Sequence, residues 1–487
     1  MKFQQVQLLV RRSLMNWKNK VVNNLNYSLA DLAKLKIHFI GIGGAGMSGI
    51  ARIMLAKGFT VSGSDKNDSA VLTSLRALGA TIFVGHAPEN ITDSELVIVS
   101  SAINEKNSEL SSAIAKGLPI AARATALAWL MSESISVAVA GTHGKTTTTA
   151  MLTVALQSAG VDPSFAIGGT INTAGTNAHS GSGQIFVAEA DESDGSFLAY
   201  RPSGAIITNI ELDHVDHFAS EKELFDVFLQ FVESIKPGGF LVACGDDAGV
   251  NTLLKQITRK DLKVYLYGKS AINDFRIDKI FLAPTKSTSV VSNTGRKVGE
   301  LNLSVAGEHN LLNALAAFAA ACALQIPEQK ALNGLETFTG TRRRFELKGE
   351  VSGIKVIDDY GHHPTELIVT LTAARNLAQS GRVLVIFQPH RYSRTAAFAM
   401  QFSKALELAD FTYLLEVYAA SEKPMAGVSS LLIAKNLSSD KIKYEPSMIQ
   451  VVEEVASLAK PGDVIITLGA GDVSSLGDPI LQALANQ

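Results

Sequence analysis

The stretch AVAGTHGKTT at 138–147 decides the fold of this chain. An apolar run ends in a turn flanked by Gly141 and Gly144, and Lys145 follows directly. Glycines let backbone N–H groups converge on phosphate oxygens, the lysine supplies a mobile cation, and a threonine hydroxyl at the next helix start can ligate Mg²⁺. Val139 stands where the common Walker pattern has glycine, so the loop is shortened. We predict a strand, a nucleotide phosphate-binding loop and a helix.

Length and composition limit the possible functions. The chain has 487 residues, 46% hydrophobic and 18% charged, which predicts about two to four domains. Its net charge of -2 favours small-molecule partners and no nucleic acid. Cys244 and Cys322 lie in apolar runs, and residues 1–27 lack the apolar core of a signal peptide. We expect a cytoplasmic protein, monomeric or weakly dimeric, without disulfides or membrane insertion.

Three segments each begin with a short apolar strand that runs into a turn rich in glycine or histidine. We place them at 35–134, 135–340 and 341–487, after an N-terminal extension at 1–34. Strands alternate with helical stretches, which is the pattern of doubly wound α/β sheets. Besides the run before the phosphate loop, the expected strands are 36–40, 60–64, 81–84, 96–100, 185–189, 205–209, 240–243, 355–357, 382–387, 411–415 and 463–468.

A second glycine loop, GIGGAG at 41–46, follows the first expected strand and precedes a helical run. Asp65 stands nineteen residues after Gly46. This spacing is typical of dinucleotide sites, in which a diphosphate lies at the helix N-terminus. NAD or FAD, another nucleotide diphosphate, and a tight turn alone are all compatible with it. Two phosphate loops in separate domains favour two nucleotides, one hydrolysed and one carried by the substrate.

Carboxylates gather after two later strands. The first group is Glu189, Asp191, Glu192 and Asp194, and the second is Glu211, Asp213 and Asp216 with His214 and His217. Like charges at this density repel unless a cation lies among them, and Mg²⁺ prefers oxygen ligands. We expect Mg²⁺ with ATP phosphates at these strand ends, and solvated acidic turns are the alternative.

The third segment repeats this arrangement. DDYGHHP at 358–364 and HRYSRT at 390–395 both follow expected strands. Arg391 and Arg394, three residues apart, can share a helix face and hold a carboxylate or phosphate. The run TRRRF at 341–345 is either a further anion-binding group or a solvated basic face.

Together these motifs closely resemble those of the Mur ligases, from about residue 35 to the C-terminus. The resemblance rests on GIGGAGMSGIA at 41–51, GTHGKTT at 141–147, EADESD at 189–194, DH at 213–214, GEHN at 307–310, Asn313, RRF at 343–345, DDYGHHP at 358–364 and HRYSRT at 390–395. It implies three α/β domains: a Rossmann-like domain for a UDP-sugar, a central P-loop ATPase-type domain, and a Rossmann-like C-terminal domain for an amino acid.

The resemblance also implies a reaction, the ATP-dependent joining of L-alanine to the lactyl carboxylate of UDP-N-acetylmuramate in peptidoglycan precursor synthesis. The carboxylate attacks the γ-phosphate, which gives an acyl phosphate and ADP, and the amine of L-alanine then displaces phosphate. The implied partners are therefore UDP-N-acetylmuramate, L-alanine and ATP, with Mg²⁺. Such phosphoryl transfer requires clamping and charge neutralisation from the protein.

The resemblance assigns residues to each role. ATP contacts are Gly141, Thr142, His143, Gly144, Lys145, Thr146, Thr147, Asn310, Asn313 and Arg343. Substrate contacts are Gly41, Gly43, Ala45, Gly46, Met47, Asp65, His86, Ser101, Tyr360, His362, Arg391 and Arg394. Thr146 and Glu189 ligate one Mg²⁺ and His214 a second, and the catalytic set is Lys145, His214, His362, Arg391 and Arg394.

One departure and three alternatives bear on this hypothesis. Several Mur ligases carry a carbamylated lysine on the helix after the Asp-His motif, but 223–235 contains no lysine, which agrees with the alanine-adding branch. A related ligase that attaches a recycled tripeptide shares the motifs, but its first loop is expected to depart from GIGGAG. A P-loop switch would not need the arginine- and histidine-rich strand ends. A dehydrogenase would leave the loop at 141–147 without a role.

Overall fold

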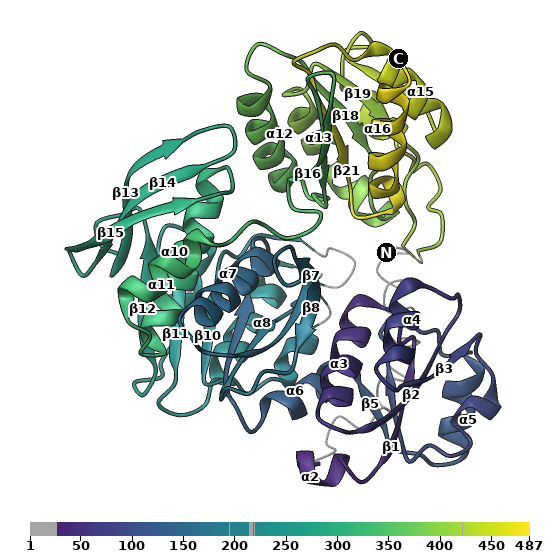
Figure 1. Cartoon of the computed structure of the whole chain (residues 1–487), viewed down its shortest axis with the longest axis vertical. Helices are drawn as coiled ribbons and strands as arrows, with labels where there is room; N and C mark the ends of the chain where they lie inside the picture. Colours follow the sequence, from purple (N-terminus) through teal and green to yellow (C-terminus); the bar gives the residue numbers. More distant parts are fainter. Residues whose placement is uncertain (1–26, 194, 214–217, 219, 421) are drawn as a thin grey trace.

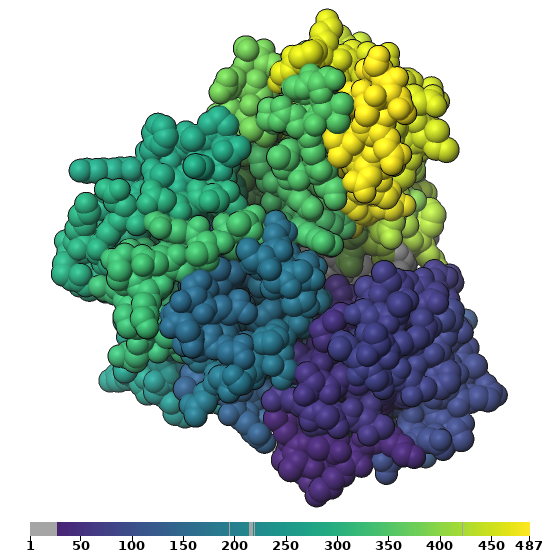
Figure 2. All heavy atoms as spheres, viewed as in Figure 1, coloured from purple at the N-terminus to yellow at the C-terminus, as the bar shows by residue number. Residues whose placement is uncertain are grey.

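The computed structural model describes residues 27–193, 195–213, 218, 220–420 and 422–487. Figure 1 shows three lobes that follow one another along the chain, each built around one sheet with helices packed against it. Figure 2 shows the lobes as three rounded bodies that adjoin one another. The predicted α/β class is confirmed.

The N-terminal lobe has five parallel strands in the order β3-β2-β1-β4-β5. The order reverses at β1, so the glycine loop at 41–46 lies at the edge where open α/β sheets bind ligands. The strands are β1 (Lys36–Ile40), β2 (Thr60–Asp65), β3 (Thr81–Val84), β4 (Leu96–Val99) and β5 (Ile120–Ala122). The helices are α2 (Leu29–Leu32), α3 (Ala45–Ala56), α4 (Ala70–Ala77), η1 (Pro88–Ile91), α5 (Ser108–Ala115) and α6 (Arg123–Met131).

The central lobe has ten strands in the order β15-β14-β13-β12-β11-β10-β6-β9-β7-β8. The strands are β6 (Ile135–Ala140), β7 (Ser164–Ile171), β8 (Thr176–His179), β9 (Ile185–Glu189), β10 (Gly204–Ile207), β11 (Phe240–Cys244), β12 (Lys263–Gly268), β13 (Phe275–Leu282), β14 (Ser287–Asn293) and β15 (Arg296–Leu303). The helices are α7 (Lys145–Ser158), η2 (Ser196–Ala199), α8 (Glu221–Glu233), α9 (Ala248–Leu254), α10 (Glu308–Ala323) and α11 (Glu328–Glu336).

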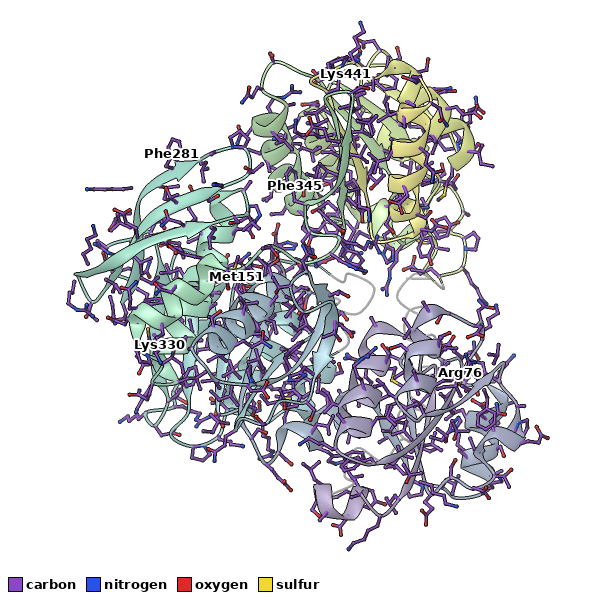
Figure 3. All side chains as sticks on the ribbon, in the orientation of Figure 1. Arg76, Met151, Phe281, Lys330, Phe345 and Lys441 are labelled. Atoms are coloured by element: carbon purple, nitrogen blue, oxygen red, sulfur yellow. The ribbon has the colours of Figure 1, made fainter. Side chains whose placement is uncertain are left out.

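The strand before the phosphate loop lies inside this sheet, between β9 and β10. Val137 and Val139 of β6 join one apolar cluster, with α7, α10 and α11. Ala138 and Ala140 join another, with α8. Because alternate residues of a strand face opposite sides, an apolar run without polar alternation is what a strand covered on both faces requires. Met151 of α7 is fully buried in the first cluster (Figure 3).

The C-terminal lobe has six strands in the order β16-β17-β21-β18-β19-β20, parallel except for β16. The strands are β16 (Glu346–Val351), β17 (Ile354–Asp359), β18 (Val383–Phe387), β19 (Phe411–Leu414), β20 (Ile442–Tyr444) and β21 (Val464–Leu468). The helices are α12 (Pro364–Ala378), α13 (Tyr392–Leu406), α14 (Leu431–Ala434), α15 (Met448–Leu458), η3 (Asp472–Leu476) and α16 (Gly477–Ala485).

Each strand expected from an apolar run is present, with its ends within two residues of the expected ones. The antiparallel meander β13–β15, which projects from the central lobe in Figure 1, was not expected. Ser, Thr and Asn make up most of β14, charged residues interrupt β13 and β15, and all three strands are partly exposed, so they lack the long apolar runs of the parallel strands. Phe281 of β13 is 65% exposed at this outer edge (Figure 3). Over the described part of the chain, no helix is long and apolar enough to cross a membrane.

Candidate active site

The loop between β6 and α7 has the predicted strand–loop–helix geometry. Gly141 and Gly144 have φ values of 130° and 81°, a region that side chains disfavour. A Cβ atom at Gly144 would lie 2.6 Å from Asn313 Oδ1, and one at Gly141 would collide with the Thr208 hydroxyl. α7 begins directly after Gly144, so the unpaired N–H groups of its first turn lie at the loop. Both glycines are therefore required for the backbone to make this turn.

Lys145 folds back over its own loop. Its Nζ donates to the carbonyl oxygens of Gly141 and Thr142, at 2.6 and 3.0 Å, and to Glu192 Oε1 at 2.9 Å. Burial alone would lower the pKa of Lys145, but Glu192 and Asp191 outweigh it and raise this pKa. Burial also raises the pKa of Glu192 to about 7, against the pull of Lys145. The lysine is thus held as a cation at the loop.

Thr146 and Glu189 form a pair beside the lysine. The Thr146 hydroxyl donates to Glu189 Oε1 at 3.0 Å, and the other carboxylate oxygen accepts the N–H of Gly168 at 2.7 Å. A hydroxyl and a carboxylate side by side at a phosphate loop are oxygen ligands of the kind that Mg²⁺ takes. The pair therefore fits the predicted metal. His214, the predicted ligand of a second Mg²⁺, lies outside the described residues.

Two cavities meet at the loop. The first, which we call the loop cavity, has a volume of about 150 Å³ and includes His143, Gly144, Thr147, Asn310, Asn313, Thr365 and Glu366 in its lining. The second, the central cavity, has a volume of about 910 Å³ and includes Thr142, Lys145, Thr146 and Glu189 with Tyr360, His362, His390, Arg391 and Arg394. The structure thus brings the predicted ATP residues Asn310 and Asn313 to the loop, and most predicted catalytic residues to one cavity.

A third cavity, the N-terminal cavity, has a volume of about 270 Å³ and lies between the N-terminal and central lobes. Its lining includes Ala45, Gly46, Met47 and Ser101, together with Glu189 and Asp191. Glu189 and Asp191 also line the central cavity, so the two cavities adjoin. The glycine loop of the N-terminal lobe therefore faces the predicted metal ligand.

Hydrogen bonds to the end of β2 hold this glycine loop in place. Asp65 accepts the N–H of Gly43 at 2.9 Å, and Gly41 donates its N–H to the carbonyl of Ser64 at 2.9 Å. His86 is 20% exposed, and its Nδ1 lies 3.1 Å from a carboxylate oxygen of the fully buried Glu109. Glu109 was not predicted, because a single acidic residue inside a helical run carries no sequence signal.

Arg394 makes an ion pair that crosses two lobes. Its guanidinium donates to both carboxylate oxygens of Asp213, at 2.9 and 3.1 Å, and both side chains are 5% exposed. Arg391 precedes α13 with a φ of 71°, an unusual value for a residue with a side chain. Arg391 and Arg394 both line the central cavity.

Tyr360, His362 and His390 complete the central cavity. Arg343 and Arg344 lie over the Tyr360 ring, with 4.8 and 5.2 Å from guanidinium carbon to ring centroid. Burial lowers the pKa of His362 and of His390 to about 3, and neighbouring arginines contribute in the same direction. Both imidazoles are therefore neutral at physiological pH and can accept a hydrogen bond.

The basic run at 341–345 lies at the hinge between the central and C-terminal lobes. Arg343, the predicted ATP residue, donates to the carbonyls of Gly469 and Gly471, at 2.8 and 3.1 Å, and lines the central cavity. Arg344 lines both the loop cavity and the central cavity. The structure therefore places Arg344, the neighbour of the predicted Arg343, in the same cavity as Asn310 and Asn313. The sequence alone could not distinguish between these arginines, because they are adjacent in a run of identical residues.

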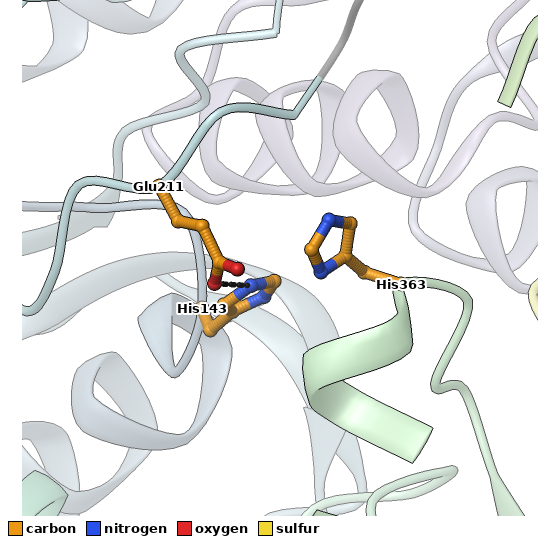
Figure 4. A group of neighbouring side chains, drawn as sticks. All are labelled: His143, Glu211 and His363. Carbon is orange, nitrogen blue, oxygen red and sulfur yellow. Dashed lines mark hydrogen bonds and ion pairs between the residues drawn. The ribbon is translucent and has the colours of Figure 1, made fainter. Parts of the chain in front are cut away.

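A group of side chains joins the phosphate loop to the C-terminal lobe (Figure 4). His143 Nε2 lies 3.2 Å from Glu211 Oε2, and the His143 ring packs on that of His363 with 4.9 Å between ring centroids. One potential metal-ligand atom from each of these three residues, an imidazole nitrogen or a carboxylate oxygen, lies within 4.8 Å of the other two. Thr365, two residues after His363, donates to Glu211 at 2.8 Å. The loop and the start of α12 are thus in direct contact.

Comparison with known proteins identifies the family. Three family models match successive parts of the chain: "Mur ligase family, catalytic domain" over 36–134, "Mur ligase middle domain" over 139–321 and "Mur ligase, glutamate ligase domain" over 343–471. The chain is 49% identical over 468 residues to the UDP-N-acetylmuramate--L-alanine ligase of Renibacterium salmoninarum, covering 95% of this chain and 98% of the relative. It is also 49% identical to that of Saccharopolyspora erythraea, covering 94% and 95%.

Solved structures agree. The UDP-N-acetylmuramate-alanine ligase of Thermotoga maritima superimposes with a TM-score of 0.78 at 30% identity, covering 92% of this chain and 98% of that one. A murein peptide ligase of Psychrobacter arcticus superimposes with a TM-score of 0.71 at 27% identity, covering 93% and 99%. The resemblance carried by the motifs is therefore confirmed over nearly the whole length, and the chain belongs to the Mur ligase family.

Proposed function

We propose that this protein joins L-alanine to the lactyl carboxylate of UDP-N-acetylmuramate, with ATP hydrolysed to ADP and phosphate through an acyl phosphate, in peptidoglycan precursor synthesis. The observation that carries the proposal is the central cavity, because residues of the phosphate loop and of the C-terminal lobe line it together. Relatives at 49% identity that cover nearly the whole chain bear the name of this activity.

The two glycine loops serve different nucleotides in this proposal. The loop at 141–147 and Lys145 bind the outer phosphates of ATP, and Asn310 and Asn313 line the adjoining loop cavity. The loop at 41–46 lines the N-terminal cavity and binds the UDP-sugar diphosphate at the start of α3. Glu189 borders both the N-terminal and the central cavity, so the lactyl carboxylate and the γ-phosphate can meet beside it.

Thr146 and Glu189 would hold Mg²⁺, which neutralises phosphate charge during transfer. Lys145 contributes a fixed positive charge at the same place, because Glu192 and the loop carbonyls hold its ammonium group. Such preorganised charge, together with the exclusion of water, is what lowers the barrier of a phosphoryl transfer. We infer that His214 ligates a second Mg²⁺.

The C-terminal lobe binds the amino acid. Arg391 receives the carboxylate of L-alanine, since a guanidinium can form two parallel hydrogen bonds to a carboxylate. The neutral His362 and Tyr360 lie in the same cavity, where the His362 imidazole can accept a hydrogen bond from the amino group of L-alanine and orient it. Arg394 acts from its ion pair with Asp213, which fixes the lobe beside the loop.

The remaining assignments extend the same proposal. We place the domain boundaries at 35–134, 135–340 and 341–487, which follows the three sheets. Cys244 and Cys322 are free thiols, which supports a reducing cytoplasmic location. We propose that the enzyme works as a monomer or weak homodimer, because all the residues assigned above come from one chain.

The product identifies the activity. Purified protein is incubated with ATP, Mg²⁺, UDP-N-acetylmuramate and an equimolar mixture of L-alanine and the tripeptide substrate of murein peptide ligases, and the products are separated by mass spectrometry. We expect UDP-N-acetylmuramate to gain the mass of one alanine residue. Gain of the tripeptide mass instead would assign the chain to the tripeptide-adding activity, and no mass gain would overturn the proposed function.

A further inference from the structure

The carboxylate of Glu366, in the first turn of α12, is shared between two lobes. Oε2 accepts the backbone N–H groups of His362 and His363, at 2.9 and 3.2 Å, which caps the helix. Oε1 lies 3.2 Å from Nδ1 of His143 in the phosphate loop. One side chain therefore holds both the turn that carries His362 and the loop that carries Lys145.

Glu366 also forms part of a wall between two cavities. Among the residues that the structure describes, only Arg344 and Glu366 line both the loop cavity and the central cavity. Arg344 Nη1 lies 3.8 Å from Glu366 Oε1, and the Glu366 side chain is 14% exposed. The wall thus stands between the residues assigned to the nucleotide and those assigned to L-alanine.

The charge of Glu366 is stable only while both lobes are in place. Burial alone would raise the pKa of this carboxyl, but its cationic neighbours His143 and Arg344 hold that pKa well below its usual range at physiological pH, where His362 is neutral. If the C-terminal lobe moves away, His143 loses one of its two carboxylate partners and Glu366 loses a cationic one. Hydrogen bonds to charged groups contribute more than neutral ones, so this contact favours the docked arrangement.

We propose that Glu366 is a positioning residue that couples docking of the C-terminal lobe to the conformation of the phosphate loop, so that the ATP and L-alanine sites form together. The inference rests on the proposed function. It adds Glu366 to the residues that this function needs, and it makes formation of the ATP site depend on formation of the L-alanine site. Glu366 contacts neither substrate in this account; it acts through His143 on one side and through the His362 turn on the other. Its replacement should therefore change the KM values of both substrates.

Steady-state kinetics of Glu366→Gln test the proposal. The amide oxygen can still accept backbone N–H groups, so α12 keeps its cap while the negative charge is lost. We expect the KM values of ATP and L-alanine each to rise about tenfold, and that of UDP-N-acetylmuramate to stay within about twofold. A purely structural role would instead lower the active fraction, and thus kcat, and leave all three KM values unchanged.

A double-mutant cycle with His143→Ala tests the contact itself. If each single variant raises the ATP KM about tenfold, the double variant should show about tenfold rather than about a hundredfold, a coupling of about 1.4 kcal/mol. Effects that multiply, or a Glu366→Gln variant with both KM values unchanged, would overturn the proposal. If Glu366→Gln does not fold, Glu366→Asp, which keeps the charge but shortens its reach, takes its place with the same expectations.

Glu328→Gln is the matched control. Glu328 also lies in the first turn of a helix, α11, and bonds Arg296 and Asn293 away from the cavities. Its kinetic constants should equal those of the unaltered enzyme. The unaltered enzyme distinguishes failure of the proposed function from failure of the role of Glu366. If it forms no alanine-added product, the proposed function is wrong. If it forms this product but the effects of Glu366→Gln and His143→Ala multiply, only the role of Glu366 is refuted.

Discussion

Replacing Lys145 with alanine should separate the two nucleotide sites and also destabilise the central lobe. The change removes the cation that faces Glu192, whose side chain is 1% exposed. Removing one partner of a buried ion pair costs about 3–5 kcal/mol; here the cost arises because Glu192, whose pKa is already about 7 beside Lys145, must bind a proton to stay buried without this cation. We expect the free energy of unfolding to fall by this amount. Ligation should fall by at least about 10²- to 10³-fold, the loss typical of removing one preorganised charge-stabilising group.

The double variant Lys145→Ala/Glu192→Gln distinguishes charge from packing. It buries no charge at this position, so urea denaturation should show most of the lost stability restored, while ligation stays as low as in the single variant. Isothermal titration with UDP-N-acetylmuramate alone should give nearly the original affinity for both variants, because that diphosphate is assigned to the loop at 41–46. The reasoning is refuted if the double variant is as unstable as the single one, or if sugar-nucleotide affinity falls as far as activity.

Three further predictions concern the metal, the amino acid and pH. Glu189→Gln should raise the Mg²⁺ concentration for half-maximal turnover at least about tenfold. If the Mg²⁺ activation curves of Glu189→Gln and Glu192→Gln superimpose, the metal assignment is wrong. Arg391→Ala should raise the L-alanine KM about a hundredfold in initial-rate kinetics, with a smaller effect on ATP, because a carboxylate loses its charged partner; equal effects would move Arg391 to the nucleotide. Glu211 and Glu366 outweigh burial and raise the pKa of His143 from 6.5 to about 9, so its contribution to docking is complete below pH 6.5 and lost as pH rises through 9. The ATP KM should therefore rise between pH 6.5 and about 9, and a flat profile would contradict this.

The residues that sequence analysis placed correctly are those whose neighbours along the chain determine their environment. Apolar runs such as Ile135–Ala140 predicted the buried parallel strands, and glycines at 141 and 144 predicted the turn that only glycine permits here. Parallel strands end at one edge of a sheet, so motifs that follow them collect there. This is why Lys145, Thr146 and Glu189 could be predicted to lie together.

Contacts between lobes could not be predicted in the same way. Asp213 and Arg394 are 181 residues apart, and Thr365 and Glu211 are 154 apart. Nothing in either local pattern indicates which sheet edges face each other once three domains dock. The sequence motifs therefore indicated the groups at each strand end, whereas the role of Glu366 and the choice between Arg343 and Arg344 depend on lobe packing.

Phosphate release in a substrate-omission series tests the central claim most directly. The purified protein is given ATP and Mg²⁺ with both, either or neither of UDP-N-acetylmuramate and L-alanine, and inorganic phosphate is followed over time. The account predicts sustained release only with both substrates, with one phosphate formed for each alanine joined. Sustained release without the UDP-sugar, or release unaffected by L-alanine, would contradict it and favour a nucleotide-dependent switch.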